Sequence, residues 1–111
     1  MDIEFASAKL QKLCEQTMKA DRELGPKVAE KLRLRLTQLE GCDTLADMRC
    51  FPAARFHKLT GNRDGQYAVD LGGGMRLVVV PSQSARTLPA GGLDLASISA
   101  VTVIYVGNYH E

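Results

Sequence analysis

Hydrophobic residues follow strand-like alternation at residues 2–5, a helical period from there to about residue 41, and strand-like alternation again after residue 54, and this order limits the folds open to the chain. After Ser7, a suitable N-cap, apolar residues recur at helical spacing and predict a helix that ends near Ala20: Leu10, Leu13, Cys14 and Met18. After Pro26, which suits the first turn of a helix, the period repeats as far as Gly41: Val28, Leu32, Leu36 and Leu39. The short Gly25-Pro26 connection predicts that the two helices form an antiparallel hairpin.

Strand-like segments lie on both sides of this hairpin in the sequence. One opens the chain and four follow the helices: residues 2–5, 55–59, 67–71, 75–80 and 101–106. Thr44 and Asp47 have the spacing of an N-cap and a first-turn acid, so one more helical turn is expected over 44–49. The predicted fold class is therefore α+β, with a short N-terminal strand and a helical hairpin packed on one face of a mostly antiparallel sheet.

Two connections in the strand region differ in kind. Gly72-Gly73-Gly74 predicts a tight turn rather than a phosphate-binding loop, because no helix pattern follows it. The segment 81–97 is rich in Pro, Gly, Ser and Ala and has no sustained period, which predicts a long, flexible loop. The chain has 111 residues, 45% hydrophobic and 24% charged, so we expect one globular domain over 1–111.

Several classes of protein are disfavoured by composition. No apolar run approaches the roughly 18 residues of a membrane span, and the N-terminus lacks the order of a signal peptide. We therefore expect a cytoplasmic protein without a membrane partner. The three cysteines, Cys14, Cys42 and Cys50, contain no CxxC pair and form no metal-ligand pattern with the histidines. Free thiols are expected, with no metal and no other cofactor.

Basic charge is concentrated in the middle of the chain although the formal net charge is only +1. Residues 27–76 hold nine basic and six acidic groups, a net of +3. Basic residues fill the positions of the second helix expected to be exposed: Lys27, Lys31, Arg33 and Arg35. Such a face is either solvated or a phosphate contact, so a nucleic-acid role stays open.

Candidate chemistry lies on the predicted strands. In residues 55–59, Phe56 and Lys58 fall on one face and His57 and Leu59 on the other. His57, the strand that carries Arg76 and the end of the last strand are expected to converge on one basic surface. Metal-free cleavage of RNA needs a proton acceptor, a proton donor and cations around the phosphate, which His, Arg and Lys supply.

Four segments of the chain carry a family resemblance: His57-Lys58-Leu59-Thr60-Gly61, Gly65-Gln66-Tyr67-Ala68-Val69, Met75-Arg76-Leu77-Val78 and Val106-Gly107-Asn108-Tyr109-His110. With the initial strand and the two helices around them, they resemble toxins of the RelE/ParE superfamily, in particular its HigB branch of plasmid-maintenance killer proteins. The resemblance covers nearly the whole chain.

The resemblance implies the toxin of a type II toxin–antitoxin pair, an endoribonuclease that cleaves mRNA in the ribosomal A site. It also implies a cognate helix-turn-helix antitoxin, HigA-like, through which alone operator DNA is contacted. By position, His57 matches a family acid or base, and Tyr109 and His110 match its C-terminal catalytic pair. Lys58 and Arg76 match the cations near the phosphate. Arg55, Arg63 and Asn108 are further candidates for RNA or phosphate contacts.

The sequence departs from the family pattern at three places. Asn108 stands where the family commonly has an acid, Met75 stands where an aromatic residue is frequent, and the loop 81–97 is longer than the usual hairpin. Two other functions therefore stay open. One is a ParE-like poison of DNA gyrase, and the other is a catalytically silent relative that only binds its antitoxin.

Overall fold

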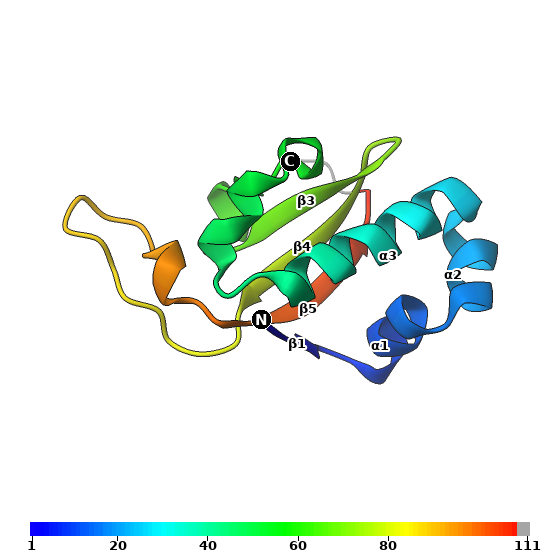
Figure 1. The fold of residues 1–111 in the computed structure, drawn as a ribbon, viewed down its shortest axis with the longest axis horizontal. Helices are drawn as coiled ribbons and strands as arrows, with labels where there is room; N and C mark the ends of the chain where they lie inside the picture. The colour runs from blue at the N-terminus through cyan, green and yellow to red at the C-terminus, as the bar shows by residue number, and fades with distance from the viewer. Residues whose placement is uncertain (109–111) are drawn as a thin grey trace.

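The structure, a computed structural model, describes residues 1–108 and is built around a five-stranded sheet (Figure 1). The strands follow the order β1-β5-β4-β3-β2, with bounds β1 (Asp2–Phe5), β2 (His57–Lys58), β3 (Tyr67–Gly72), β4 (Met75–Pro81) and β5 (Ala100–Gly107). β1 lies parallel to β5, and every other pairing is antiparallel. The predicted fold class is confirmed, and the predicted central strand is β4.

Three helices, rather than the predicted two, follow β1: α1 (Ala8–Glu15), α2 (Thr17–Leu24) and α3 (Pro26–Gly41). The Ser7 hydroxyl accepts a hydrogen bond from the Leu10 N–H at 3.2 Å, as predicted for an N-cap. The prediction of one helix to Ala20 is wrong, because Gln16 is extended (φ −101°, ψ 106°) and ends α1. Met18 is consequently 81% exposed, and α2 instead buries Ala20 with Leu13 and Ala29.

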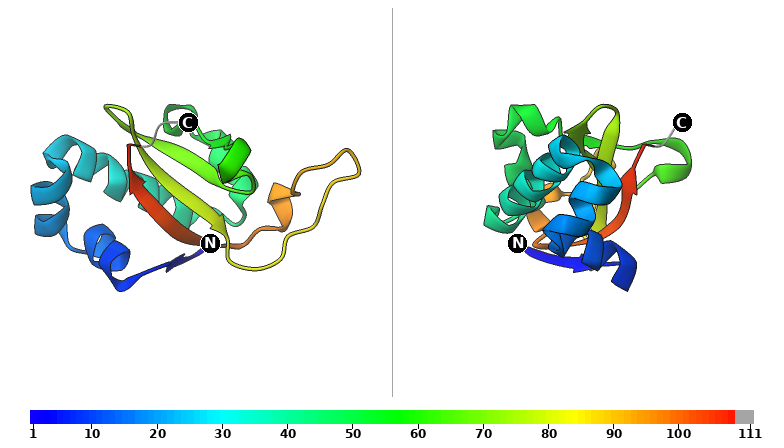
Figure 2. Two further views of the ribbon diagram at one scale, coloured as in Figure 1. Left: turned by 180° about the vertical axis from the view of Figure 1, so that it is seen from behind. Right: turned by 90° about the vertical axis from the view of Figure 1, so that its right-hand side faces the viewer.

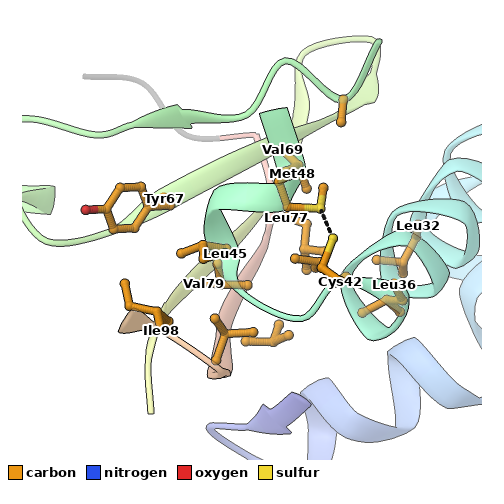
Figure 3. Packing of buried hydrophobic residues seen from close by; sticks show 14 of the residues in the cluster. Leu32, Leu36, Cys42, Leu45, Met48, Tyr67, Val69, Leu77, Val79 and Ile98 are labelled. Carbon is orange, nitrogen blue, oxygen red and sulfur yellow. Dashed lines mark hydrogen bonds between the residues drawn. The ribbon is translucent and has the colours of Figure 1, made fainter. Parts of the chain in front are cut away.

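α3 covers one face of the sheet (Figure 1). Its apolar stripe packs on inward-facing residues of β3 and β4, drawn in Figure 3, in a cluster that includes Leu32, Leu36, Leu39, Val69, Leu77 and Val79. The stripe has the predicted spacing. The prediction that Arg35 is exposed is wrong: it is 3% exposed, because it lies three residues after Leu32 and four before Leu39, on the same side of the helix.

The opposite face of the sheet carries a smaller cluster. Leu59, Ala68 and Val78 are buried there together, with Ile104 and Tyr105 packed against them. Leu59 thus lies on this face, whereas Phe56 stacks on Tyr67 of the helix-covered face, with ring centroids 5.5 Å apart. The predicted division of residues 55–59 between two faces is confirmed for these side chains.

Two short 3-10 segments, η1 (Leu45–Cys50) and η2 (Pro52–Ala54), join α3 to β2, and a third, η3 (Gly61–Arg63), joins β2 to β3. Thr44 and Asp47 form a capping box at the start of η1, which confirms the predicted turn. The tight turn at Gly72-Gly73-Gly74 is also confirmed, with φ values of 90°, 59° and 82° that favour glycine.

The connection between β4 and β5, residues 82–99, is named the arm here. Figure 2 shows that it projects beyond the end of the sheet, on the side away from α2. It contains no strand and no α-helix, as its composition predicts, but Thr87 and Leu93 form a bridge and η4 (Leu95–Ser97) follows. Leu95 and Ile98 anchor its base in the main core. Across residues 1–108, no helix has the length and apolar composition needed to cross a membrane.

Candidate functional site

His57 lies on the edge strand β2, on the sheet face opposite α3. The pairing places it directly across from Ala68 in β3, and Asp70 stands across from Arg76 in β4. Because partners across a ladder share a face and side chains alternate along a strand, His57, Asp70 and Arg76 point to the same side of the sheet. The convergence that the sequence predicts for His57 and Arg76 is therefore present.

The ring of His57 is held by a local hydrogen bond. Its Nδ1 lies 2.6 Å from the carbonyl oxygen of Arg55, two residues earlier. A carbonyl oxygen only accepts, so Nδ1 carries the proton, and in the neutral ring Nε2 becomes the proton acceptor. Arg55 itself is left-handed, with a φ of 49°, which is unusual for a residue with a side chain. This turn directs the Arg55 carbonyl toward the histidine.

A hollow of about 330 Å³ opens beside His57 and is named the histidine hollow here. It is lined by His57, Lys58, Leu59, Thr60, Gly74, Arg76 and Asn108. A second hollow, of about 470 Å³, adjoins it and is lined by Arg55, Phe56, His57, Asp70 and Arg76. His57 and Lys58 of β2, Arg76 of β4 and Asn108 after β5 therefore meet at one surface.

The Arg76 guanidinium is held by two hydrogen bonds. Its Nη1 donates to Asp70 Oδ1 at 2.8 Å and to the Met75 carbonyl at 3.1 Å, and the two side chains of the ion pair are 29% and 25% exposed. Both contacts use one nitrogen of a guanidinium that has five N–H donors. The outer edge of Arg76 can therefore bind a phosphate oxygen while Asp70 holds the group in place.

Lys58 and Arg63, two other predicted cations, have contacts of a different kind. Lys58 Nζ lies 3.9 Å from Asp64 Oδ1, with side chains 52% and 77% exposed, so this pair contributes little stability. Arg63 Cζ lies 5.2 Å from the centre of the Tyr105 ring, a cation–π geometry on the same face of the sheet. The Asn108 side chain lies against Gly74, so closely that a β-carbon at position 74 would be 3.2 Å from its Nδ2.

Arg35 lies behind this surface and joins its two halves, a role that the sequence reasoning missed. Its Nε donates to the carbonyl of Asp70 at 2.9 Å, and Nη2 donates to the carbonyl of Ala53 at 2.9 Å. Ala53 belongs to η2, the turn that leads into Arg55 and His57, and Asp70 is the residue that holds Arg76. One buried cation thus ties the segment carrying the histidine to the strand that positions the arginine.

Two predicted residues, Tyr109 and His110, lie outside the described residues. Within residues 1–108, no cluster of three or more His, Cys, Asp or Glu residues could hold a metal ion. Cys14 and Cys42 are buried and Cys50 is exposed, and all three are free thiols, as predicted.

Comparison with protein families places residues 3–84 in one family, described as the RelE-like toxin of the type II toxin–antitoxin system HigB. No curated protein matches the chain significantly.

Solved structures share the fold at low sequence identity. The chain is similar to a YoeB/ParE toxin from Agrobacterium tumefaciens, with 13% identity over 99% of this chain and 100% of that chain, at a TM-score of 0.55. It is also similar to YafQ from E. coli, with 14% identity over 96% and 91% of the two chains, at a TM-score of 0.56. A YoeB–YefM complex from Staphylococcus aureus matches with 16% identity over 100% and 98%, at a TM-score of 0.51.

Proposed function

This chain belongs to the HigB family of RelE-like toxins of type II toxin–antitoxin systems, and from that premise we propose that it is an endoribonuclease that cleaves mRNA on the ribosome. One observation carries the proposal. His57, with Nδ1 fixed 2.6 Å from a backbone carbonyl, shares a sheet face and a hollow with an arginine that a carboxylate holds in place. This pairing of a proton acceptor with an oriented cation suits phosphodiester chemistry.

The proposed reaction needs no group beyond the substrate and the side chains of the site. The 2′-hydroxyl oxygen of the RNA attacks the adjacent phosphorus, and the bond from phosphorus to the 5′-oxygen breaks. His57 Nε2 takes the proton from the 2′-hydroxyl, and Arg76 binds the phosphate oxygens as negative charge builds up on them. The products carry a 2′,3′-cyclic phosphate and a 5′-hydroxyl.

The remaining roles come from the family resemblance. His110 is proposed to give a proton to the leaving 5′-oxygen, and Tyr109 is proposed to position the RNA. Lys58 and Asn108 line the same hollow as His57, which supports their assignment to RNA contacts. Asn108 donates or accepts a hydrogen bond but carries no charge, so it positions substrate without transferring a proton.

The proposed partners are those of such a toxin. A cognate antitoxin with a helix-turn-helix domain, HigA-like, is proposed to bind the chain and to contact operator DNA on its behalf. The YoeB–YefM complex among the similar structures supports a protein partner of this general kind. Co-expression of the two proteins, followed by co-purification, tests the pairing directly.

The decisive test of the activity is a cell-free translation reaction with added toxin, in which new mRNA ends are mapped by primer extension. Wild-type protein is expected to create new 5′ ends only when ribosomes are present. His57→Gln, His110→Ala and Arg76→Gln are each expected to remove them. Arg22→Gln is the matched control for Arg76→Gln, because Arg22 is an exposed arginine on α2, outside the hollows described above.

Each variant is first checked for an unchanged circular dichroism spectrum, so that loss of cleavage is separated from loss of the fold. Intact mRNA with folded wild-type protein would refute the proposal. A parallel gyrase cleavage assay then decides between the two alternatives: trapped DNA breaks would identify a gyrase poison, and their absence would leave an antitoxin-binding protein.

A further inference from the structure

The arm contributes to a third hollow, of about 300 Å³, on the other side of β2 from the histidine hollow. We name it the arm hollow, and its walls include Phe56, Lys58, Tyr67, Gly91, Gly92 and Leu93. Gly91 and Gly92 have φ values of 91° and 80°, a region that favours glycine, so their exposed peptide groups form this wall without a side chain. The tip is turned back by hydrogen bonds between Leu88 and both glycines, each 2.9 Å.

Two exposed cations border the arm hollow. Arg49 extends from η1 and Lys58 from β2, and both residues are exposed. Within residues 1–108 Arg49 forms no ion pair, and Lys58 has only its loose contact with Asp64 at 3.9 Å. Exposed cations of this kind attract the phosphates of a nucleic acid.

The hydroxyl of Tyr67 supplies a polar group to this hollow. Tyr67 is only 4% exposed, and its ring stacks on Phe56. Figure 3 shows its hydroxyl directed away from the packed core. Within residues 1–108, no protein group forms a hydrogen bond with this hydroxyl. Since every fully buried polar side-chain atom in this range has a partner, the Tyr67 hydroxyl is not fully buried. It therefore opens into the hollow that Tyr67 lines. Burial, and secondly the Asp64 carboxylate, raise the pKa of Tyr67, so the phenol keeps its proton and acts as a donor.

We propose that the arm hollow binds a phosphate of the RNA chain next to the phosphate that is cleaved. The Tyr67 hydroxyl donates to a phosphate oxygen, and Arg49 and Lys58 supply the opposite charge. His57 and Lys58 border both the arm hollow and the histidine hollow. One strand of RNA that crosses β2 therefore occupies both hollows at once. This inference rests on the proposed function, since it takes RNA as the substrate.

The test is RNA binding without cleavage. A short fluorescein-labelled RNA, with every 2′-hydroxyl methylated, is titrated with each protein and followed by anisotropy at several salt concentrations. Tyr67→Phe keeps the stacked ring and removes only the hydroxyl, and it is expected to weaken binding about tenfold. Arg49→Gln is expected to lower the slope of log K against log salt by about 0.7, the value for one phosphate contact with a single strand.

Arg22→Gln, on α2 at the opposite end of the molecule from the arm, is the matched control and is expected to bind as wild type (Figure 1). Unchanged affinity and salt slope in both Tyr67→Phe and Arg49→Gln would overturn the inference. Inorganic phosphate is titrated separately: if it binds in a way that depends on Tyr67 and Arg49 while the RNA does not, the hollow is a site for free phosphate and the inference is again overturned.

The translation assay separates this inference from the proposed function. Cleavage by wild-type protein together with unchanged RNA binding by both variants overturns the phosphate subsite alone. Wild-type protein that neither binds the RNA nor cleaves mRNA overturns both proposals. The thermal midpoint of each variant is measured beforehand, and Tyr67→Phe is expected to fold as wild type because the packed ring is retained.

Discussion

Replacing Arg35 by methionine is predicted to destabilise the protein far more than any exposed arginine replacement. Methionine fills much of the same volume but removes all three hydrogen bonds of the guanidinium, to Asp70 and Ala53 at 2.9 Å and to Gln38 Oε1 at 3.2 Å. Two backbone carbonyls then lose a partner at a site where Arg35 itself is 3% exposed. Both hydrogen bonds are partly buried, and a buried polar group left unpaired costs about 1–3 kcal/mol.

The net loss is smaller than the sum of these terms. Burying a guanidinium with only neutral acceptors carries its own desolvation cost, which methionine relieves. The Gln38 amide can turn toward water and find another partner. Together these effects lead us to expect a loss of about 3 kcal/mol in the free energy of unfolding. For a domain of this size, that loss lowers the melting temperature by roughly 12 °C.

Arg33→Met is the matched control, two residues earlier on the same helix. Arg33 pairs with Asp21 at 3.4 Å, but the two side chains are 39% and 42% exposed, so its loss should cost less than about 0.5 kcal/mol. Urea unfolding followed by circular dichroism measures both variants. Equal stabilities for Arg35→Met and Arg33→Met would refute the reasoning. Full recovery with Arg35→Lys would also refute it, because lysine replaces the two guanidinium nitrogens that bind the carbonyls by a single ammonium nitrogen.

Three further predictions concern burial and ionisation. Burial, with a smaller effect from Glu15, raises the pKa of Cys14 to about 11, and burial also raises the pKa of Cys42 and Tyr67. Since the folded state favours the neutral forms of these groups, their contribution to the free energy of unfolding is complete below pH 9 and is lost as the pH rises toward 11. Urea unfolding midpoints at pH 8 and pH 10.5 measure this loss, and a higher midpoint at pH 10.5 would contradict it. Iodoacetamide at pH 8 should modify Cys50 first, since it is the exposed thiol, and peptide mass spectrometry locates the label; early modification of Cys14 would contradict its burial. Met18→Gln should change the free energy of unfolding by less than about 0.5 kcal/mol, because Met18 is 81% exposed, and a larger loss in urea unfolding would show that the helix break at Gln16 is misplaced.

Elements that depend on local chemistry were predictable from the sequence. Ser7 caps α1, Thr44 and Asp47 form their capping box, and the three glycines after β3 make the expected turn. The break at Gln16 was not predictable, because the helical period of apolar residues continues through it as far as Met18. The break is instead linked to the packing of Ala20 against Ala29, a contact between two helices.

The site was predictable to the extent that it depends on strand order. His57, Arg76 and Asn108 meet because β2, β3, β4 and β5 are consecutive neighbours in the sheet, which a meander predicts. Arg35 had a usable signal, its spacing from Leu32 and Leu39, but a charged residue on a buried stripe is rare enough to be read as exposed. Its acceptors come from residues 53 and 70, which no local pattern connects to α3.

A strand of only two residues holds His57 by few ladder hydrogen bonds, so its position must be determined by what surrounds it. On one side Phe56 stacks on Tyr67, and on the other Leu59 is buried with Ala68 and Val78. Before the strand, the turn that carries the Arg55 carbonyl is anchored through Arg35. The histidine can therefore lie at an exposed edge, open to a long polymer substrate, and still keep a defined ring orientation. A site built deeper in the sheet would gain rigidity but lose access for the continuous strand that the proposed RNA cleavage requires.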